Sequence, residues 1–206
     1  MNPAEAEIVH DLPDALAAAI GRVVAAYSRL EHKMLMIVAL LLQLQKPEAR
    51  VALRNGRPTD LLDTALQIFA LRDIDYRIDA AKLKSSLEAA KRERDLLAHG
   101  VWLKQPHSPI LYLQIARGQW SEASEDGYAV NRAVFPQSKP YSDKEANEVL
   151  QVIEAAILLA DQLGEQVDTA LVEYPERFRQ PAPILDPLAR RASRRRQRTK
   201  EWPDSR

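Results

Sequence analysis

The chain has 206 residues, of which 46% are hydrophobic and 28% charged, and its 29 basic residues balance its 29 acidic residues. This composition is typical of a globular protein with one substantial core, and the zero net charge argues against a uniformly basic nucleic-acid binder. Cysteine is absent, which excludes disulfides, thiolate metal sites and cysteine nucleophiles.

The N-terminal residues, MNPAEAEIVHDLPD, are acidic and lack the basic-then-apolar order of a signal peptide. The longest apolar run, Met34 to Leu42, is far shorter than a membrane span. The four histidines, at positions 10, 32, 99 and 107, show no HxxxH or HxH spacing. We therefore expect a cytoplasmic protein with no membrane segment, no metal site and no cofactor.

Most of the chain shows the periodicity of amphipathic helices. A long helix is predicted from about residue 13 to 45, and its segment from Met34 to Leu42 is apolar around most of the circumference. Such a segment is buried on several sides, either in the centre of a bundle or at a dimer interface. A short helix follows from Pro47, the next begins near Thr59, and a fourth runs from about residue 75 to a stop at Gly100.

The pattern changes after Gly100, where residues from about 101 to 136 are β-prone and broken by turns, which predicts a small antiparallel hairpin or three-stranded patch. Ser142 and Glu145 then form a capping box before a second long helix that ends near Tyr174. The predicted fold is mainly α, a helical bundle of four or five helices with a small antiparallel β insertion.

Three parts are predicted along the chain: an N-terminal extension (1–12), the helical domain (13–174) and a tail (175–206) rich in proline and arginine, which we expect to be disordered. The tail carries a cluster of arginines that would bind RNA or another polyanion with salt-sensitive, sequence-independent affinity. The cluster comprises Arg190, Arg191, Arg194, Arg195, Arg196 and Arg198. A solubilising tail and a segment that binds an acidic partner are the alternatives.

One stretch, KRERDLLAHGVW at residues 91–102, suggests a specific chemistry. Arg94 is a permanent cation with a planar fork suited to phosphate, and His99 exchanges protons near neutral pH. Together they suit the cleavage of RNA by its own 2′-hydroxyl, a reaction that needs no metal. Asp95 would accept a hydrogen bond from either side chain.

The spacing of the two side chains poses a geometric problem. Five residues turn a helix by about 140° beyond a full turn, so Arg94 and His99 do not share a face. They would converge only through an irregular helix end, through a long reach by Arg94, or through pairing with a second copy of the chain.

The run R-D-L-L-A-H resembles the Arg-x4–6-His signature of the HEPN superfamily (higher eukaryotes and prokaryotes nucleotide-binding domains), including the polar residue after the arginine. Together with YSRLEHKMLMIVALLL in the first helix, it is similar to bacterial and phage HEPN-like proteins over roughly residues 13–173 in helix order. The β-prone residues directly after the motif depart from that pattern.

The resemblance implies a homodimeric, metal-independent endoribonuclease of a toxin–antitoxin or phage-defence system, whose cleft is composed from two protomers. Arg94 would then stabilise the scissile phosphate, His99 would act as general acid or base, and Asp95 would orient them. An antitoxin or another protein would be a partner.

Other interpretations stay open. Arg94 and His99 also fit a solvated charged face that ends in a histidine favoured by the helix dipole. A non-catalytic HEPN-like protein that binds protein or nucleic acid is the alternative function. Glu31 and Tyr27 are further candidates for the site, against an exposed polar stripe for Glu31 and core packing for Tyr27.

Overall fold

The computed structural model describes residues 6–114, 119–125, 128–134 and 138–179. Its helices are α1 (Asp14–Leu41), α2 (Lys46–Ala52), α3 (Pro58–Leu71), α4 (Ala80–His99), α5 (Asp143–Glu173) and α6 (Pro175–Arg179). Its strands are β1 (Glu7–Ile8), β2 (Val101–Lys104), β3 (Leu111–Gln114), β4 (Gln119–Glu125), β5 (Tyr128–Val134) and β6 (Lys139–Tyr141). The protein is mainly helical with a small antiparallel sheet, as the sequence predicts. None of these described helices is long and apolar enough to cross a membrane.

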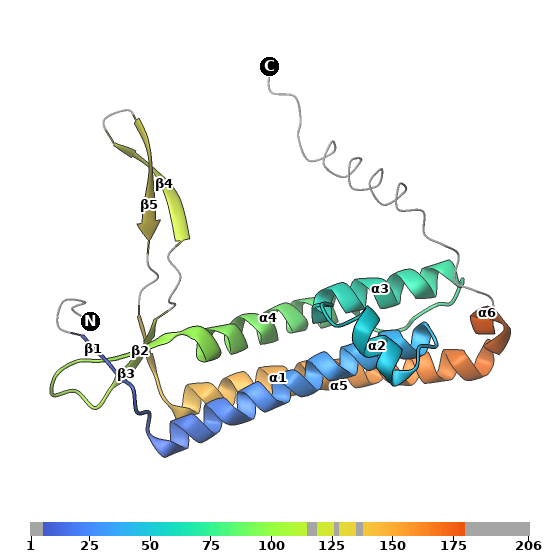
Figure 1. Cartoon of the computed structure of the whole chain (residues 1–206), viewed down its shortest axis with the longest axis horizontal. Helices are drawn as coiled ribbons and strands as arrows, with labels where there is room; N and C mark the ends of the chain where they lie inside the picture. The colour runs from blue at the N-terminus through green and yellow to red at the C-terminus, as the bar shows by residue number, and fades with distance from the viewer. Residues whose placement is uncertain (1–5, 115–118, 126–127, 135–137, 180–206) are drawn as a thin grey trace.

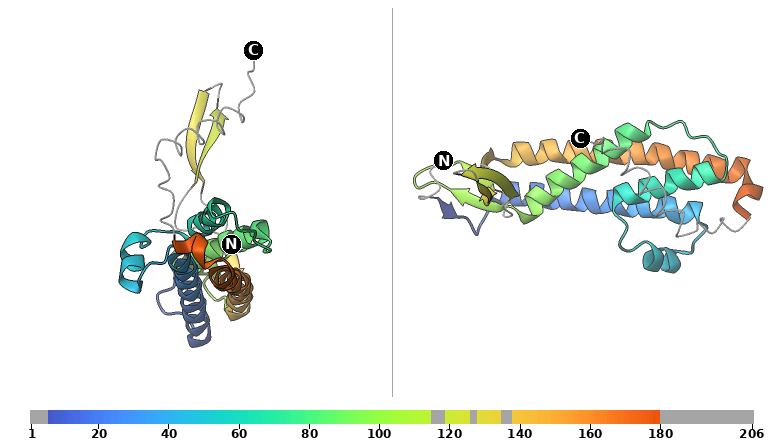
Figure 2. Two further views of the ribbon diagram at one scale, coloured as in Figure 1. Left: turned by 90° about the vertical axis from the view of Figure 1, so that its right-hand side faces the viewer. Right: turned by 90° about the horizontal axis from the view of Figure 1, so that it is seen from above.

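The two longest helices lie side by side and run in the same direction (Figures 1 and 2). Arg22 of α1 donates a hydrogen bond of 3.2 Å to Asn147 of α5, and further along Lys33 of α1 pairs with Asp161 of α5. The helix α4 packs against both and runs in the opposite direction. The residues after the motif therefore lie at the end of the bundle where α1 and α5 begin.

The apolar segment of α1 is buried by other helices of the same chain. Met34, Val38 and Leu41 are fully covered, whereas Leu40 remains 41% exposed. Of the two settings that the sequence allows for this segment, the structure therefore favours the centre of a bundle.

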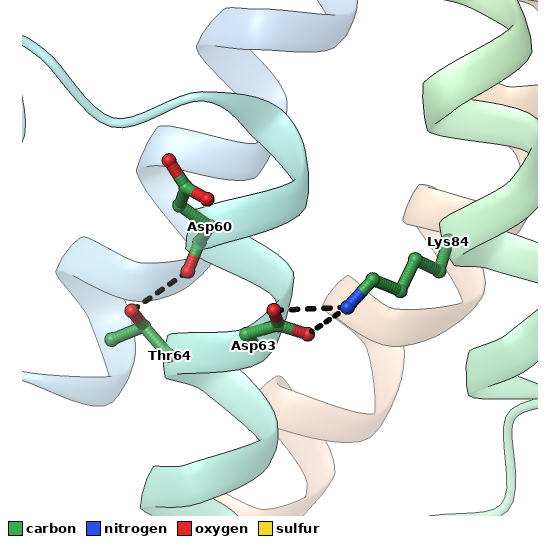
Figure 3. Close-up of polar contacts among 4 residues, drawn as sticks. All are labelled: Asp60, Asp63, Thr64 and Lys84. Atoms are coloured by element: carbon green, nitrogen blue, oxygen red, sulfur yellow. Dashed lines mark hydrogen bonds and ion pairs between the residues drawn. The ribbon is translucent and has the colours of Figure 1, made fainter. Parts of the chain in front are cut away.

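Polar side chains join α3 to α4 on the surface of the bundle (Figure 3). Lys84 of α4 reaches both carboxylate oxygens of Asp63 of α3, at 2.9 and 3.0 Å. The hydrogen bond to Asp63 raises the pKa of Lys84. Thr64 donates to the backbone carbonyl of Asp60 within α3, at 2.8 Å. Because Lys84 and Asp63 are nearly half exposed, their pair contributes little to stability.

A four-stranded antiparallel sheet of order β1-β2-β3-β6 covers the end of the bundle at which α4 stops (Figure 1). Trp102 of β2 faces Leu113 of β3 in the register, and its ring meets the ring of Tyr141 edge-on, with centroids 5.6 Å apart. The strands β4 and β5 form a separate two-stranded ladder that stands away from the bundle.

The sheet contains more strands than the sequence predicts. The expected hairpin or three-stranded patch omits β1, in the predicted N-terminal extension, and β6, beyond residue 136. Both are too short to show an alternating pattern, and β6 contains Pro140, which suits only an edge strand. The fourth helix is also shorter than expected, because Asp79 caps its start by accepting a hydrogen bond from the Lys82 backbone at 2.9 Å.

A sixth helix extends the packed region past the predicted boundary at Pro175. Phe178 of α6 is only 3% exposed, and the Arg72 guanidinium lies 4.5 Å from the centre of its ring. Arg177 donates in turn to the carbonyl of Arg72, at 3.0 Å. This helix could not be predicted from the sequence because five residues are too few to show periodicity. Pro175 suggests a break, but proline also suits the first position of a helix. The predicted count of four or five helices is therefore one or two too low for the described chain.

Candidate functional site

The motif lies on the last turns of α4, which remains helical through His99. Gly100 leaves the helix with an extended backbone, at φ −74° and ψ 155°. A Cβ at Gly100 would lie 2.4 Å from Cδ1 of Leu113 and 2.6 Å from the carbonyl oxygen of Leu96. Glycine therefore allows β2 to turn away directly after His99 and pair with β3.

Arg94 points from α4 to the neighbouring helix α1, and its side chain is only 22% exposed. Its guanidinium carbon lies 4.3 Å from the centre of the Tyr27 ring. Its Nη2 lies 3.6 Å from Oε1 of Glu31, one turn after Tyr27 on α1. The structure thus brings both further candidates of the sequence, Tyr27 and Glu31, into contact with Arg94.

Asp95 completes a polar cluster, which we name the Arg94 cluster: Tyr27, Glu31, Lys91, Arg94 and Asp95. Nη1 of Arg94 lies 3.0 Å from Oδ1 of Asp95, and Nζ of Lys91 lies 2.6 Å from Oδ2 of the same carboxylate. The cluster therefore contains two cations and two carboxylates. Sequence reasoning missed Lys91, although its separation of four residues from Asp95 is the spacing at which helical ion pairs form.

Burial raises the pKa of both members of the cluster from α1. Tyr27 is 2% exposed, and burial raises its pKa, an increase that the neighbouring Arg94 opposes. Burial also raises the pKa of Glu31; Arg94 opposes that increase and Asp95 reinforces it. Within the described chain, neither the Tyr27 hydroxyl nor Nε of Arg94 has a hydrogen-bond partner.

His99 does not join the cluster. It is exposed at the end of α4, and its side chain forms no hydrogen bond or ion pair with the described residues. Because α4 is continuous from Arg94 to His99, the offset of about 140° around the helix applies. An irregular helix end is thereby excluded as a way to bring the two side chains of one copy together.

The remaining candidates lie elsewhere. The six arginines of the tail, from Arg190 to Arg198, are outside the described residues. A cavity of about 460 Å³ opens between the starts of α1 and α5 and the strands β3 and β6. Its walls are mainly apolar and include Leu16, Ile110 and Tyr141, but neither Arg94 nor His99.

The last turns of α4 therefore present two groups with different chemistry. The Arg94 cluster offers a guanidinium fork that is suited to an oxyanion but already engaged by carboxylates. His99 offers an imidazole that is open to solvent and suited to proton transfer. A single copy of the chain keeps these groups on different faces of α4.

No family model, no curated protein and no solved structure matches this chain. The function of the site is therefore inferred from its own residues.

Proposed function

We propose that the protein is a metal-independent endoribonuclease of HEPN type that acts as a homodimer in the cytoplasm. The observation that carries this proposal is the presence of two different groups on α4. Arg94 is half-buried and held by neighbouring side chains, whereas the side chain of His99, at the helix end, is exposed and has no partner among the described residues. The resemblance of R-D-L-L-A-H to the HEPN signature adds the expectation that two copies complete one cleft.

The reaction would proceed by transesterification. The RNA 2′-hydroxyl gives up its proton and attacks the adjacent phosphorus, and the 5′-oxygen takes a proton as it leaves. The products are a 2′,3′-cyclic phosphate and a 5′-hydroxyl end. A dimer would supply two copies of His99, one for each proton transfer, and Arg94 would stabilise the charge that develops on the phosphate.

The test incubates the purified protein with mixed-sequence RNA in the presence of EDTA and analyses the ends of the products by mass spectrometry. We expect cleavage with cyclic phosphate ends by the wild type and at least a hundredfold loss for His99→Ala, because removing a general acid or base costs about that much. His107→Ala is the matched control, since His107 is also exposed but lies in the loop between β2 and β3. Equal RNA survival with wild type and His99→Ala would count against catalysis.

A non-catalytic binding module is the second candidate, and a specific observation favours it. Both terminal nitrogens of Arg94 already face carboxylates of the same chain, so the arginine also serves to join α4 to α1. If that is its whole role, the protein would bind another protein or nucleic acid without cutting it, an antitoxin-like partner included. Light scattering that shows a monomer would weaken the endoribonuclease proposal, because one copy keeps Arg94 and His99 apart.

A further inference from the structure

The Arg94 guanidinium has three nitrogens, and each has different surroundings. Nη1 faces Asp95 at 3.0 Å, Nη2 faces Glu31 at 3.6 Å, and Nε is buried. One face of the group lies against the ring of Tyr27. An incoming oxyanion at Nη1 or Nη2 therefore competes with one of the two carboxylates.

The two carboxylates are held with unequal strength. Asp95 is bound on both oxygens, by Arg94 at 3.0 Å and by Lys91 at 2.6 Å, and is only 33% exposed. Among the described residues, Glu31 has one ion-pair contact, 3.6 Å long, and its side chain is 46% exposed. Partial burial and the nearby Asp95 carboxylate both disfavour its charged form. Glu31 is thus the partner that a ligand would displace.

Resting on the proposed function, we infer that Glu31 is a specificity-determining residue. It contacts Nη2 of Arg94 in the free protein and is displaced from this nitrogen by an RNA phosphate. Asp95, anchored by Lys91, keeps the guanidinium in place on Tyr27 during the exchange. The phosphate therefore enters on the α1 side of α4, next to Glu31.

This arrangement selects for the strength of the incoming oxyanion. Entry requires that the contact between the anion and Arg94 exceed the loose contact with Glu31, so weakly bound anions are disfavoured. A phosphodiester oxygen satisfies the requirement, because a charge-assisted hydrogen bond between a guanidinium nitrogen and a phosphate oxygen is shorter and stronger than a 3.6 Å contact with a nearly half-exposed carboxylate. Removing the charge of Glu31 should therefore tighten binding, the reverse of the result expected for a positioning residue.

The experiment measures the affinity for a short mixed-sequence RNA with 2′-O-methyl groups throughout, which binds but cannot be cut, by fluorescence anisotropy. The proteins are the full-length wild type, Glu31→Gln, Arg94→Gln and the double variant. We expect Glu31→Gln to bind about two- to fivefold more tightly, the range set by a partly exposed ion pair. The double variant should bind like Arg94→Gln, because the effect of Glu31 acts through Arg94.

Controls separate this inference from general charge effects. Glu165→Gln removes one negative charge from an exposed position on α5 and should leave the affinity unchanged. Tightening by Glu31→Gln that persists in the Arg94→Gln background, or that Glu165→Gln reproduces, would overturn the role of Glu31. Weaker binding by Glu31→Gln would overturn it too.

The outcome for Arg94 is distinct. If Arg94→Gln weakens binding while Glu31→Gln has no effect, the proposed function stands and the role of Glu31 fails. If Arg94→Gln binds as tightly as the wild type, Arg94 takes no phosphate and both proposals fail. Urea unfolding of each variant confirms that the compared proteins are folded.

Discussion

The Arg94 guanidinium lies over the ring of Tyr27, with 4.3 Å between its central carbon and the ring centre. A buried aromatic residue of the first helix thus supports the cation of the motif on the fourth. Such cation–π contacts contribute about 0.5–2 kcal/mol, depending on how far the pair is removed from water. The contact links the stability of the bundle to the position of Arg94.

Two substitutions separate the ring of Tyr27 from its hydroxyl. Tyr27→Phe keeps the ring and removes a buried hydroxyl with no hydrogen-bond partner in the described chain, so the free energy of unfolding should stay the same or rise slightly. Tyr27→Ala removes the ring from a fully packed position and should cost about 3–5 kcal/mol. Urea unfolding followed by circular dichroism measures both. If Tyr27→Phe lowers the free energy of unfolding as much as Tyr27→Ala does, the stabilisation comes from the hydroxyl and not from the ring.

Stability should fall at alkaline pH because of two buried tyrosines. Burial raises the pKa of Tyr27 and of Tyr141 above the ordinary value of 10.0, so the folded protein retains protons that the unfolded chain releases. Their contribution is complete below pH 10 and is lost as the pH rises from there through the folded-state values.

The measurement is the free energy of unfolding in urea between about pH 8 and pH 11. The decline above pH 10 should be less steep for the double variant Tyr27→Phe, Tyr141→Phe than for the wild type. Parallel curves would mean that lysines and the exposed tyrosines account for the whole decline.

Gly100→Ala should destabilise the junction between α4 and β2. The added Cβ would come within 2.4 Å of Leu113 and 2.6 Å of the Leu96 carbonyl, and the carbonyl belongs to the backbone of α4. Overpacking of this kind costs about 1–3 kcal/mol. Gly21→Ala is the matched control, because nothing lies within 4 Å of the corresponding position on α1. Thermal unfolding should show a lower midpoint for Gly100→Ala and an equal or higher one for Gly21→Ala.

Phe178 should be needed for full stability although it lies past the predicted end of the domain. Phe178→Ala removes a ring that is 3% exposed and contacts Arg72, and it should cost about 3 kcal/mol in urea unfolding. Glu176→Ala, two residues away on the exposed side of α6, should change the stability by less than about 0.5 kcal/mol. If both variants unfold like the wild type, α6 contributes no packing energy.

The long helices could be predicted from the sequence because their apolar faces repeat over many turns. The capping box that opens α5 also appears as predicted, with Glu145 accepting from the Ser142 backbone at 2.8 Å. By contrast β1, β6 and α6 have two, three and five residues. Such short elements form because they pack or pair with segments that are distant in the sequence, and a local sequence pattern does not indicate these contacts.

The motif itself could be found from residue types and spacing, but its surroundings could not. A stop at Gly100 was predicted from its place after the periodic residues, whereas the reason for glycine, the approach of Leu113, depends on the pairing of β2 with β3. Glu31 is a candidate because the polar pair Glu31 and His32 interrupts an apolar stretch, and Tyr27 is one because it lies one turn before Glu31. Their contact with Arg94 follows from the rotation of α1 against α4, which the sequence does not specify.

The two ends of the described chain are fixed at opposite ends of the bundle. β1 pairs with Leu103 and Lys104 of β2, at the end of the bundle where α4 stops, whereas α6 packs beside Arg72 at the end of α3 (Figure 1). The helix α5, at about 46 Å, spans most of the distance between them. An affinity tag or fluorophore placed ahead of β1 would therefore stand at the same end of the bundle as the motif, but past Lys104, which is the end of β2 farther from His99. One attached directly after α6 would stand at the opposite end of the bundle.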